Sequence, residues 1–200
     1  MSYAIIGFGK IGRAIAKAFA RKGIEVSVAT TRDPESFAAD ATAIGPTILA
    51  ETLAEAVKAD IIFLAVRFEA YQDIAKALPS WQGKIIVDVT NAYGVPPEDL
   101  GGQPSARFVA RAFSGGRLVK GLNHLAAAVL DQDPAVHGGR RVVFLASDDD
   151  DAASEIGALA ERLGFAPIKL GALSEGGLLV QARGNSWGHL IFKDLVKFDG

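Results

Sequence analysis

Three glycines near the start of the chain are spaced as in a phosphate-binding loop. They lie in the stretch AIIGFGKIGRAIAKAF (residues 4–19), after a short apolar run and at the start of a helical pattern. In such a loop Gly7 permits a tight turn, Gly9 lets the backbone approach a pyrophosphate, and Gly12 lets the helix lie close to the strand. The phosphates would meet free N–H groups at the N-terminus of the helix. Because a strand, the glycines, a helix and a second strand all fall within residues 3–29, the stretch predicts dinucleotide binding. Its candidate cofactor-binding residues are Gly7, Phe8, Gly9, Lys10, Ile11 and Gly12.

The residues that follow the second apolar stretch bear on the choice of dinucleotide. Proteins that bind NAD normally offer Asp or Glu to the ribose hydroxyls there. This chain has Thr30, Thr31 and Arg32 instead, and its first carboxylate is Asp33. A hydroxyl and a guanidinium would accept a 2′-phosphate, which a carboxylate would repel. Hydrogen bonds to charged groups contribute about 1.5–3 kcal/mol each, so two of them favour NADP over NAD by about two powers of ten or more. The prediction is therefore NADP; the alternative is that Arg32 is a solvated loop residue and Asp33 only a helix cap.

The elements that must position these residues alternate between strands and helices. Apolar runs predict strands at residues 3–6, 24–29, 46–49, 60–66, 84–89 and 117–122, and helical patterns lie between them at 13–22, 51–59, 69–78 and 105–113. Two further strands, at 140–147 and 166–170, bracket a helix at 152–164. This alternation predicts an α/β fold with a doubly wound, Rossmann-type, mostly parallel sheet of about eight strands. Residues 1–172 are expected to form the NADP-binding domain.

The end of the chain follows a different pattern. Residues 173–200 are expected to form a short C-terminal helical arm and not an independent domain. The apolar residues of the arm recur at a spacing that places them on one face of a helix. Such a face must pack on the sheet or on a second subunit, so we expect a homodimer. The residues of this face are Trp187, Leu190, Ile191, Leu195 and Phe198.

The composition argues against several other classes of function. The 200 residues carry a formal net charge of −2 and no basic tract, so no nucleic acid or anionic membrane is expected as a partner. No cysteine is present, which excludes disulfides, thiolate metal ligands and a thiol nucleophile. The histidines lie far apart and the acidic run at 148–151 is typical of a helix start, so no metal site is expected. No signal peptide is recognised and no apolar run reaches the ~18 residues of a membrane helix, which predicts a cytoplasmic protein.

Several longer stretches resemble a known family. They are IIGFGKIGRAIAKAFARKGIEVSVATTR, IIFLAV, VDVTNAYG, VKGLNHL and the closing HLIFKDLVKF. Together they resemble the NADPH:deazaflavin oxidoreductase family, whose best-known members pass hydride between NADP and coenzyme F420. The same fold occurs in the reductase domain of membrane metalloreductases. The related β-hydroxyacid dehydrogenases share the opening but need a large all-helical second half, for which the chain after residue 122 is too short.

This resemblance implies further cofactor contacts at the ends of later strands. The residues that end the fourth strand would lie beside the pyrophosphate and ribose, and the asparagine after the fifth strand beside the nicotinamide ribose. The segment after the sixth strand would lie close to the nicotinamide. All are at carboxyl ends of strands, where such sheets bind ligands. Family members commonly have proline where Arg67 stands, and Arg67 either reaches a phosphate or an acidic substrate, or is solvated. The residues implied are Ala65, Val66, Arg67, Asn91, Asn123, Leu125 and Ala126.

Hydride transfer between two rings depends more on orientation and on the exclusion of water than on side-chain acids. The sequence shows no Ser-His-Asp group, paired carboxylates or Tyr-x-x-x-Lys arrangement. His124 is the candidate catalytic residue, as a proton donor or a hydrogen-bond partner of the acceptor, or else it is a packed loop histidine. Lys120 pairs with a buried carboxylate such as Asp88, or it touches the ligand. Trp187 and Phe192 either wall the acceptor pocket or belong to the core.

The function predicted from these observations is that of an NADP-dependent oxidoreductase. It would transfer hydride between NADP(H) and a small-molecule ring or carbonyl acceptor of the deazaflavin, flavin or quinone type. Two alternatives remain open. One is a non-catalytic NADP(H)-binding sensor or regulatory protein, which would keep the glycine loop and Arg32 but lack an acceptor pocket. The other is a carbonyl or imine reductase that uses His124 as its acid.

Overall fold

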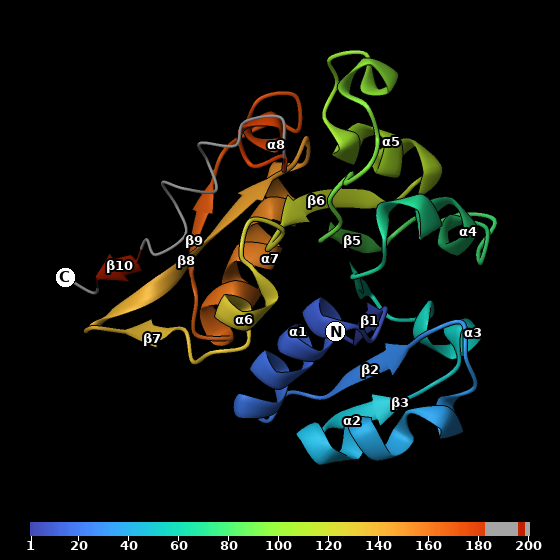
Figure 1. Cartoon of the computed structure of the whole chain (residues 1–200), viewed down its shortest axis with the longest axis vertical. Helices are drawn as coiled ribbons and strands as arrows, with labels where there is room; N and C mark the ends of the chain where they lie inside the picture. Colours follow the sequence, from blue (N-terminus) through green and yellow to red (C-terminus); the bar gives the residue numbers. More distant parts are fainter. Residues whose placement is uncertain (183–195, 199–200) are drawn as a thin grey trace.

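The computed structural model describes residues 1–182 and 196–198, which fold around one large β-sheet (Figure 1). Across the sheet the strands follow the order β10-β8-β6-β5-β4-β1-β2-β3, and β7 and β9 pair with β8. The first six strands are parallel, and their order 3-2-1-4-5-6 is that of a doubly wound Rossmann sheet. The predicted fold class is therefore confirmed. The strands are β1 (Tyr3–Ile6), β2 (Val26–Ala29), β3 (Ile48–Ala50), β4 (Ile61–Leu64), β5 (Ile85–Asp88), β6 (Arg117–Gly121), β7 (Ala135–Val136), β8 (Gly139–Ala146), β9 (Ala166–Lys169) and β10 (Val196–Phe198).

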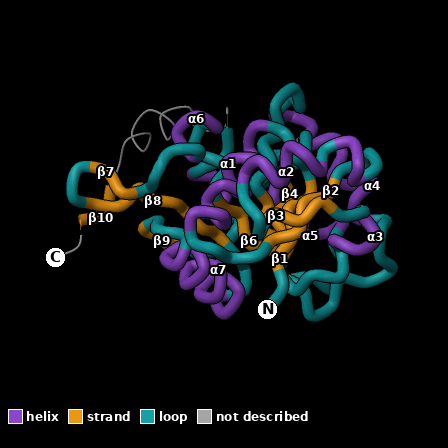
Figure 2. The backbone as a smooth tube through the Cα atoms, turned by 90° about the horizontal axis from the view of Figure 1, so that it is seen from below, coloured by secondary structure: helices purple, strands orange, loops and turns teal. Residues whose placement is uncertain are grey.

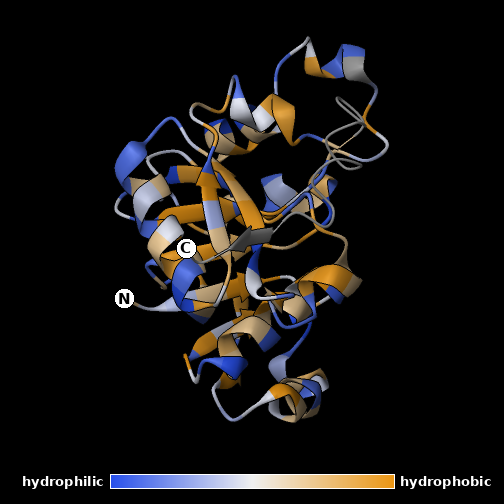
Figure 3. Ribbon diagram, turned by 90° about the vertical axis from the view of Figure 1, so that its left-hand side faces the viewer, coloured by the Kyte–Doolittle hydropathy of each residue, from blue (hydrophilic) through white to orange (hydrophobic). Residues whose placement is uncertain are grey.

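Helices cover both faces of this sheet, so successive residues of a strand face different cores. Ile5 of β1 packs in one core cluster with Phe19 and Ile156, whereas its neighbour Ile6 packs in a second cluster with Val109. Because both faces are covered, a central strand such as β4 is apolar and buried at every position, and hydrophobic strands lie in the middle of the molecule (Figure 3). The helices are α1 (Lys10–Arg21), α2 (Ala38–Ile44), α3 (Leu53–Ala56), α4 (Tyr71–Ala75), α5 (Ser105–Ala112), α6 (Ala127–Leu130), α7 (Asp150–Arg162) and α8 (Gly176–Leu179), with 3₁₀ helices η1 (Pro34–Ser36), η2 (Phe68–Ala70) and η3 (Pro97–Leu100).

The direction of the sheet reverses at β8. This strand runs antiparallel to β6, with Lys120 opposite Ala146 and Gly121 opposite Leu145. Because β6 ends at Gly121, the earlier residues of β8 continue past the carboxyl edge of the parallel strands. We call residues 139–144 the β8 overhang. It pairs with β7, β9 and β10, and Figure 2 shows β7, β10 and the start of β8 projecting from one side of the molecule.

The structure also corrects some expected boundaries. The helix expected at 51–59 is only the four residues of α3, and the helix expected at 69–78 divides into η2 and α4. The hairpin between β7 and β8 was not predicted. His137 and Gly138 form its turn with φ values of 49° and 82°, and such two-residue turns need a positive φ at both positions.

The end of the C-terminal arm differs from the expected helix. Val196–Phe198 form β10, which pairs antiparallel with Arg141 to Gly139 of β8. The helical spacing predicted to reach Phe198 therefore does not hold there, because the overhang offers backbone N–H and C=O groups that an added strand can pair. The short helix α8 lies earlier in the arm. Trp187, His189, Leu190, Ile191, Phe192 and Leu195 lie outside the described residues.

The acidic run at 148–151 starts a helix, as predicted. Asp149 is the N-cap of α7, and its carboxylate accepts a hydrogen bond of 2.8 Å from the Ala152 N–H. The same carboxylate binds the Arg117 guanidinium at 2.8 and 3.0 Å. The hydrogen bond from Arg117, followed by that from the Ala152 amide, lowers the pKa of Asp149 to about 2. This group therefore stabilises the fold above its unfolded pKa of about 3.9, and the contribution is lost as the pH falls towards 2.

Replacing Asp149 with alanine is expected to lower the free energy of unfolding by about 1 kcal/mol at pH 7, as for the loss of other helix N-caps. The difference from the unaltered protein should shrink as the pH falls from 4 towards 2, because the carboxylate is by then protonated in the unfolded state and becomes protonated in the folded state as well. Urea unfolding at several pH values measures it. Glu161→Ala, an exposed carboxylate of the same helix, is the control. An equal loss in both variants would contradict the capping role.

Candidate cofactor-binding site

The glycine loop connects β1 to α1, and two of its glycines are required by their surroundings. Gly7 has a φ of +103°, and a methyl group there would collide with the carbonyl of Ala65 at the end of β4. A methyl group on Gly12 would collide with the carbonyl oxygen of Gly7. Gly9 differs, because nothing lies within 4 Å of the position that a methyl group would take. The loop is thus tightly packed on the protein side and open above Gly9.

The open side of this loop faces unpaired helical amides. α1 begins at Lys10, Gly9 is its N-cap, and no side chain caps it. Its first-turn N–H groups, from Lys10, Ile11 and Gly12, have no partner within the helix. The first turn carries no acidic residue, so the positive end of the helix dipole is not neutralised there. This arrangement fits the phosphates of a dinucleotide.

A cavity of about 350 Å³ lies beside the loop, at the carboxyl ends of β4 and β5. It brings together residues from three of the segments that sequence reasoning selected: Ile11 after β1, Val66 after β4 and Asn91 after β5. Sequence reasoning missed Tyr93, whose exposed ring also lines the cavity. The signal for it was an aromatic residue two positions after the selected asparagine. The full lining is Ile11, Ala65, Val66, Arg67, Phe68, Glu69, Val89, Thr90, Asn91 and Tyr93.

Arg67 stands at the rim of this cavity with 90% of its side chain exposed. Its Nε lies 3.7 Å from a carboxylate oxygen of Glu69. A pair this exposed is worth little, so the guanidinium can turn to another anion at small cost.

Thr30, Thr31 and Arg32 follow β2 as predicted. The hydroxyl of Thr30 accepts a hydrogen bond of 3.0 Å from the Arg32 N–H, which holds the turn. The guanidinium of Arg32 is exposed and lies 5.7 Å from the ring centroid of Phe37. Phe37 in turn contacts Phe8 of the glycine loop, with ring centroids 5.7 Å apart. A cation is thus held on the glycine-loop side of β2, where the adenosine end of a dinucleotide lies in this fold.

A buried ion pair between β5 and β6 lies beside the cavity. Lys120 Nζ lies 3.1 Å from Asp88 Oδ2, and their side chains are 1% and 0% exposed. Burial lowers the pKa of Lys120, and the Asp88 carboxylate opposes this effect. Of the two roles considered for Lys120, the structure shows the pairing with Asp88.

The segment after β6 reaches the site through Asn123. The Asn91 and Asn123 side chains are joined at 3.0 Å, and the Asn91 amide also donates to the Asn123 carbonyl at 2.9 Å. Leu125, in contrast, is buried in the core with α1 and α7, and Ala126 is the exposed N-cap residue of α6. Neither lines the cavity, so a contact of either with the cofactor stays a prediction.

His124 is buried and faces the β8 overhang. Its Nε2 is 3.4 Å from the Val142 carbonyl, and its ring centroid is 4.8 Å from that of Phe144. It does not line the cavity. A role of His124 as a proton donor stays a prediction.

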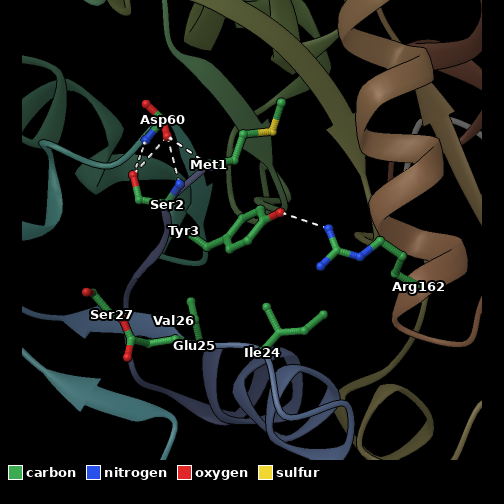
Figure 4. Close-up of a pocket in the computed structure, with 9 residues that line it drawn as sticks. All are labelled: Met1, Ser2, Tyr3, Ile24, Glu25, Val26, Ser27, Asp60 and Arg162. Carbon is green, nitrogen blue, oxygen red and sulfur yellow. Dashed lines mark hydrogen bonds and ion pairs between the residues drawn. The ribbon is translucent and has the colours of Figure 1, made fainter.

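A larger hollow of about 820 Å³ opens at the other end of the strands (Figure 4). Asp60 accepts hydrogen bonds from the backbone and side chain of Ser2 there, which lower its pKa, and Arg162 donates to the Tyr3 hydroxyl at 3.2 Å. The hollow lies at the amino ends of β1 and β2, away from the glycine loop. Parallel sheets of this kind bind ligands at the carboxyl ends, so the smaller cavity is the candidate site.

Comparison with known proteins agrees with this geometry. The family described as NADP oxidoreductase, coenzyme F420-dependent, matches residues 2–92, which hold the glycine loop, Arg32 and most of the cavity lining. The crystal structure of hypothetical protein SMa0349 from Sinorhizobium meliloti is 35% identical, with a TM-score of 0.90 over 100% of this chain and 96% of that one. The first part of the chain, residues 2–92, is thus similar to the F420-dependent NADP oxidoreductase family.

Two further relatives are similar to most of this chain. A proposed F420-dependent NADP reductase from Arthrobacter sp. FB24 is 28% identical, with a TM-score of 0.69 over 86% of each chain. The metalloreductase STEAP3 of Rattus norvegicus is 30% identical over 173 residues, which are 85% of this chain but 34% of that protein. The chain thus spans about a third of the length of that relative. In the described residues of this chain, no helix has the length and apolarity needed to cross a bilayer. The same residues hold no group of three or more His, Cys, Asp or Glu that could bind a metal ion.

Proposed function

We propose that this chain oxidises NADPH and passes the hydride to a planar ring acceptor of the deazaflavin, flavin or quinone type. The observation that carries the proposal is the cavity next to the open face of the glycine loop. A dinucleotide whose phosphates lie over Gly9 would direct its nicotinamide end into it. When bound, NADP(H) supplies the hydride.

The residues of the chain would bind and orient. The α1 amides would hold the phosphates and Arg32 the 2′-phosphate. Ile11 and Val66 give the cavity an apolar wall that excludes water, and Asn91 offers a polar group beside the ribose. A ring acceptor takes its proton from solvent, so the arrangement needs no side-chain acid.

The test combines binding with turnover. Calorimetric titration with NADPH and NADH should show binding with a preference for NADPH. NADPH oxidation is then followed with a deazaflavin, a flavin, a quinone and a small ketone or imine. Turnover with one of the ring acceptors supports the proposal. Tight NADPH binding without turnover on any of them would favour a sensor.

Turnover with only the ketone or imine would favour a carbonyl or imine reductase with His124 as its acid. That function predicts a large loss of kcat in His124→Ala and a pH profile with a limb that is absent from this variant.

We also propose, from the apolar spacing of the arm, that the protein is a homodimer, and from its composition that it acts in the cytoplasm. Light scattering coupled to gel filtration tests the first. A molar mass of one chain at all concentrations would contradict it.

A further inference from the structure

The Lys120–Asp88 pair does more than fill space in the interior of the protein. Asp88 ends β5 and Lys120 lies opposite it in β6, so two neighbouring strands each contribute one charge at the same level. The Lys120 ammonium also donates to the carbonyl of Thr90. The other oxygen of Asp88 accepts from the Thr90 N–H at 2.9 Å and from the Thr90 hydroxyl at 2.7 Å. All three polar groups of Thr90 are therefore bound by this one pair.

Thr90 and Asn91 form the wall of the cavity where β5 ends. Asn91 is fixed in turn by Asn123, whose amide also donates to the Val180 carbonyl at 2.9 Å. The chain reaches Asn123 through Leu122, which has a φ of +62°, a conformation that is strained for a residue other than glycine. Hydrogen bonds from Lys120 to Thr90, the peptide bond between Thr90 and Asn91, and hydrogen bonds from Asn91 to Asn123 thus connect the ion pair to the turn after β6.

The free energy of folding alone does not explain why such an ion pair is buried. Removing two charges from water costs much of what their attraction returns, and a well-packed apolar pair often stabilises a core as well. What an apolar pair would not do is bind the N–H, the C=O and the hydroxyl of one loop residue. The use of this pair is therefore to hold that residue in place.

We propose that Lys120 is a positioning residue: through Thr90 it fixes the wall against which the nicotinamide half of the cofactor rests. This inference rests on the proposed function for the identity of the cofactor. It assigns no contact between Lys120 and the ligand, because the ammonium is buried and both of its described partners belong to the protein.

The test separates the two halves of the cofactor. Lys120→Met removes the donor to Thr90, and Asp88→Asn/Lys120→Met does so without leaving a buried charge unpaired. The probes are NADPH and 2′,5′-ADP, which carries the adenosine and the 2′-phosphate but no nicotinamide. The affinity for NADPH should fall about tenfold in both variants, while that for 2′,5′-ADP stays within about twofold. A displaced wall should also lower kcat about tenfold or more at saturating NADPH.

Arg117→Met is the matched control. It removes an ion-paired cation from the same strand, at the end away from the cavity, and should leave the ratio of the two affinities unchanged. If the Lys120 variants lost affinity for both probes equally, or for neither, the positioning role would be wrong while the proposed function stood. If the unaltered protein bound neither probe, both would fall. The double variant keeps the test open should Lys120→Met fail to fold.

Discussion

Arg32→Ala should lower the affinity for NADPH by about a hundredfold or more and leave the affinity for NADH almost unchanged. The guanidinium is the only side chain of the turn after β2 that brings a positive charge, and Phe37 holds it on the glycine-loop side of the strand. Two charge-assisted hydrogen bonds to a 2′-phosphate are worth about 3–6 kcal/mol in sum, and part of this is offset by the loss of solvent contacts. NADH has no 2′-phosphate and so loses nothing.

Arg111→Ala is the control for this experiment. Arg111 also lies over an aromatic ring, 5.8 Å from the centroid of Phe108, but near the end of α5, which lies away from the glycine loop. Isothermal titration at two ionic strengths adds a second measurement. Salt should weaken NADPH binding more in the unaltered protein than in Arg32→Ala, because the exposed ion pair is screened. Equal affinity of the unaltered protein for NADPH and NADH would contradict the role of Arg32.

Gly9→Ala should separate cofactor binding from stability. Gly9 has φ −81° and ψ −164°, which alanine adopts readily, and the added methyl group meets no protein atom. We therefore expect the melting temperature to stay within the range of a neutral surface substitution. The methyl group would occupy the space through which the pyrophosphate approaches the backbone, and an overlap of about 1–3 kcal/mol lowers NADPH affinity by about 10- to 100-fold.

Gly12→Ala is the partner variant and should behave differently. Alanine is favoured in a helix by about 1 kcal/mol over glycine, but here its methyl group collides with the backbone of Gly7. Backbone cannot move aside as a flexible side chain can, so both the stability and NADPH affinity should fall. Thermal unfolding and titration of the two variants together provide the measurement. Tight NADPH binding by Gly9→Ala would mean that the phosphates do not lie over this loop.

The cofactor edge could be predicted from the sequence because its determinants are local. Ile5 and Ile6 belong to opposite cores, and this two-sided burial is visible as an uninterrupted apolar run. The role of Gly12 follows from its distance along the chain, since it packs against Gly7 within one strand–helix unit, whereas Gly7 is constrained by Ala65 after β4.

What could not be predicted depends on residues that are distant in sequence. The orientation of His124 is set by Phe144 in a strand whose direction cannot be read from its own residues. The hydrogen bonds that hold Thr90 depend on Lys120, which lies thirty residues later in the chain. A lysine inside a strand does not reveal which atoms its ammonium will bind. β10 shows the same limit, because the apolar spacing near Phe198 suits a helix until β8 provides a strand to pair with.

The β8 overhang lies apart from the segments that would hold the phosphates of a dinucleotide. It extends past the last parallel strand by six residues, roughly 20 Å at the usual rise per residue, and so stands beside the edge where a cofactor would lie. Every residue proposed to bind the phosphates precedes the overhang in the chain. Substitutions and insertions in the overhang and its partner strands could therefore change the surface that an acceptor meets without lowering the affinity for the cofactor.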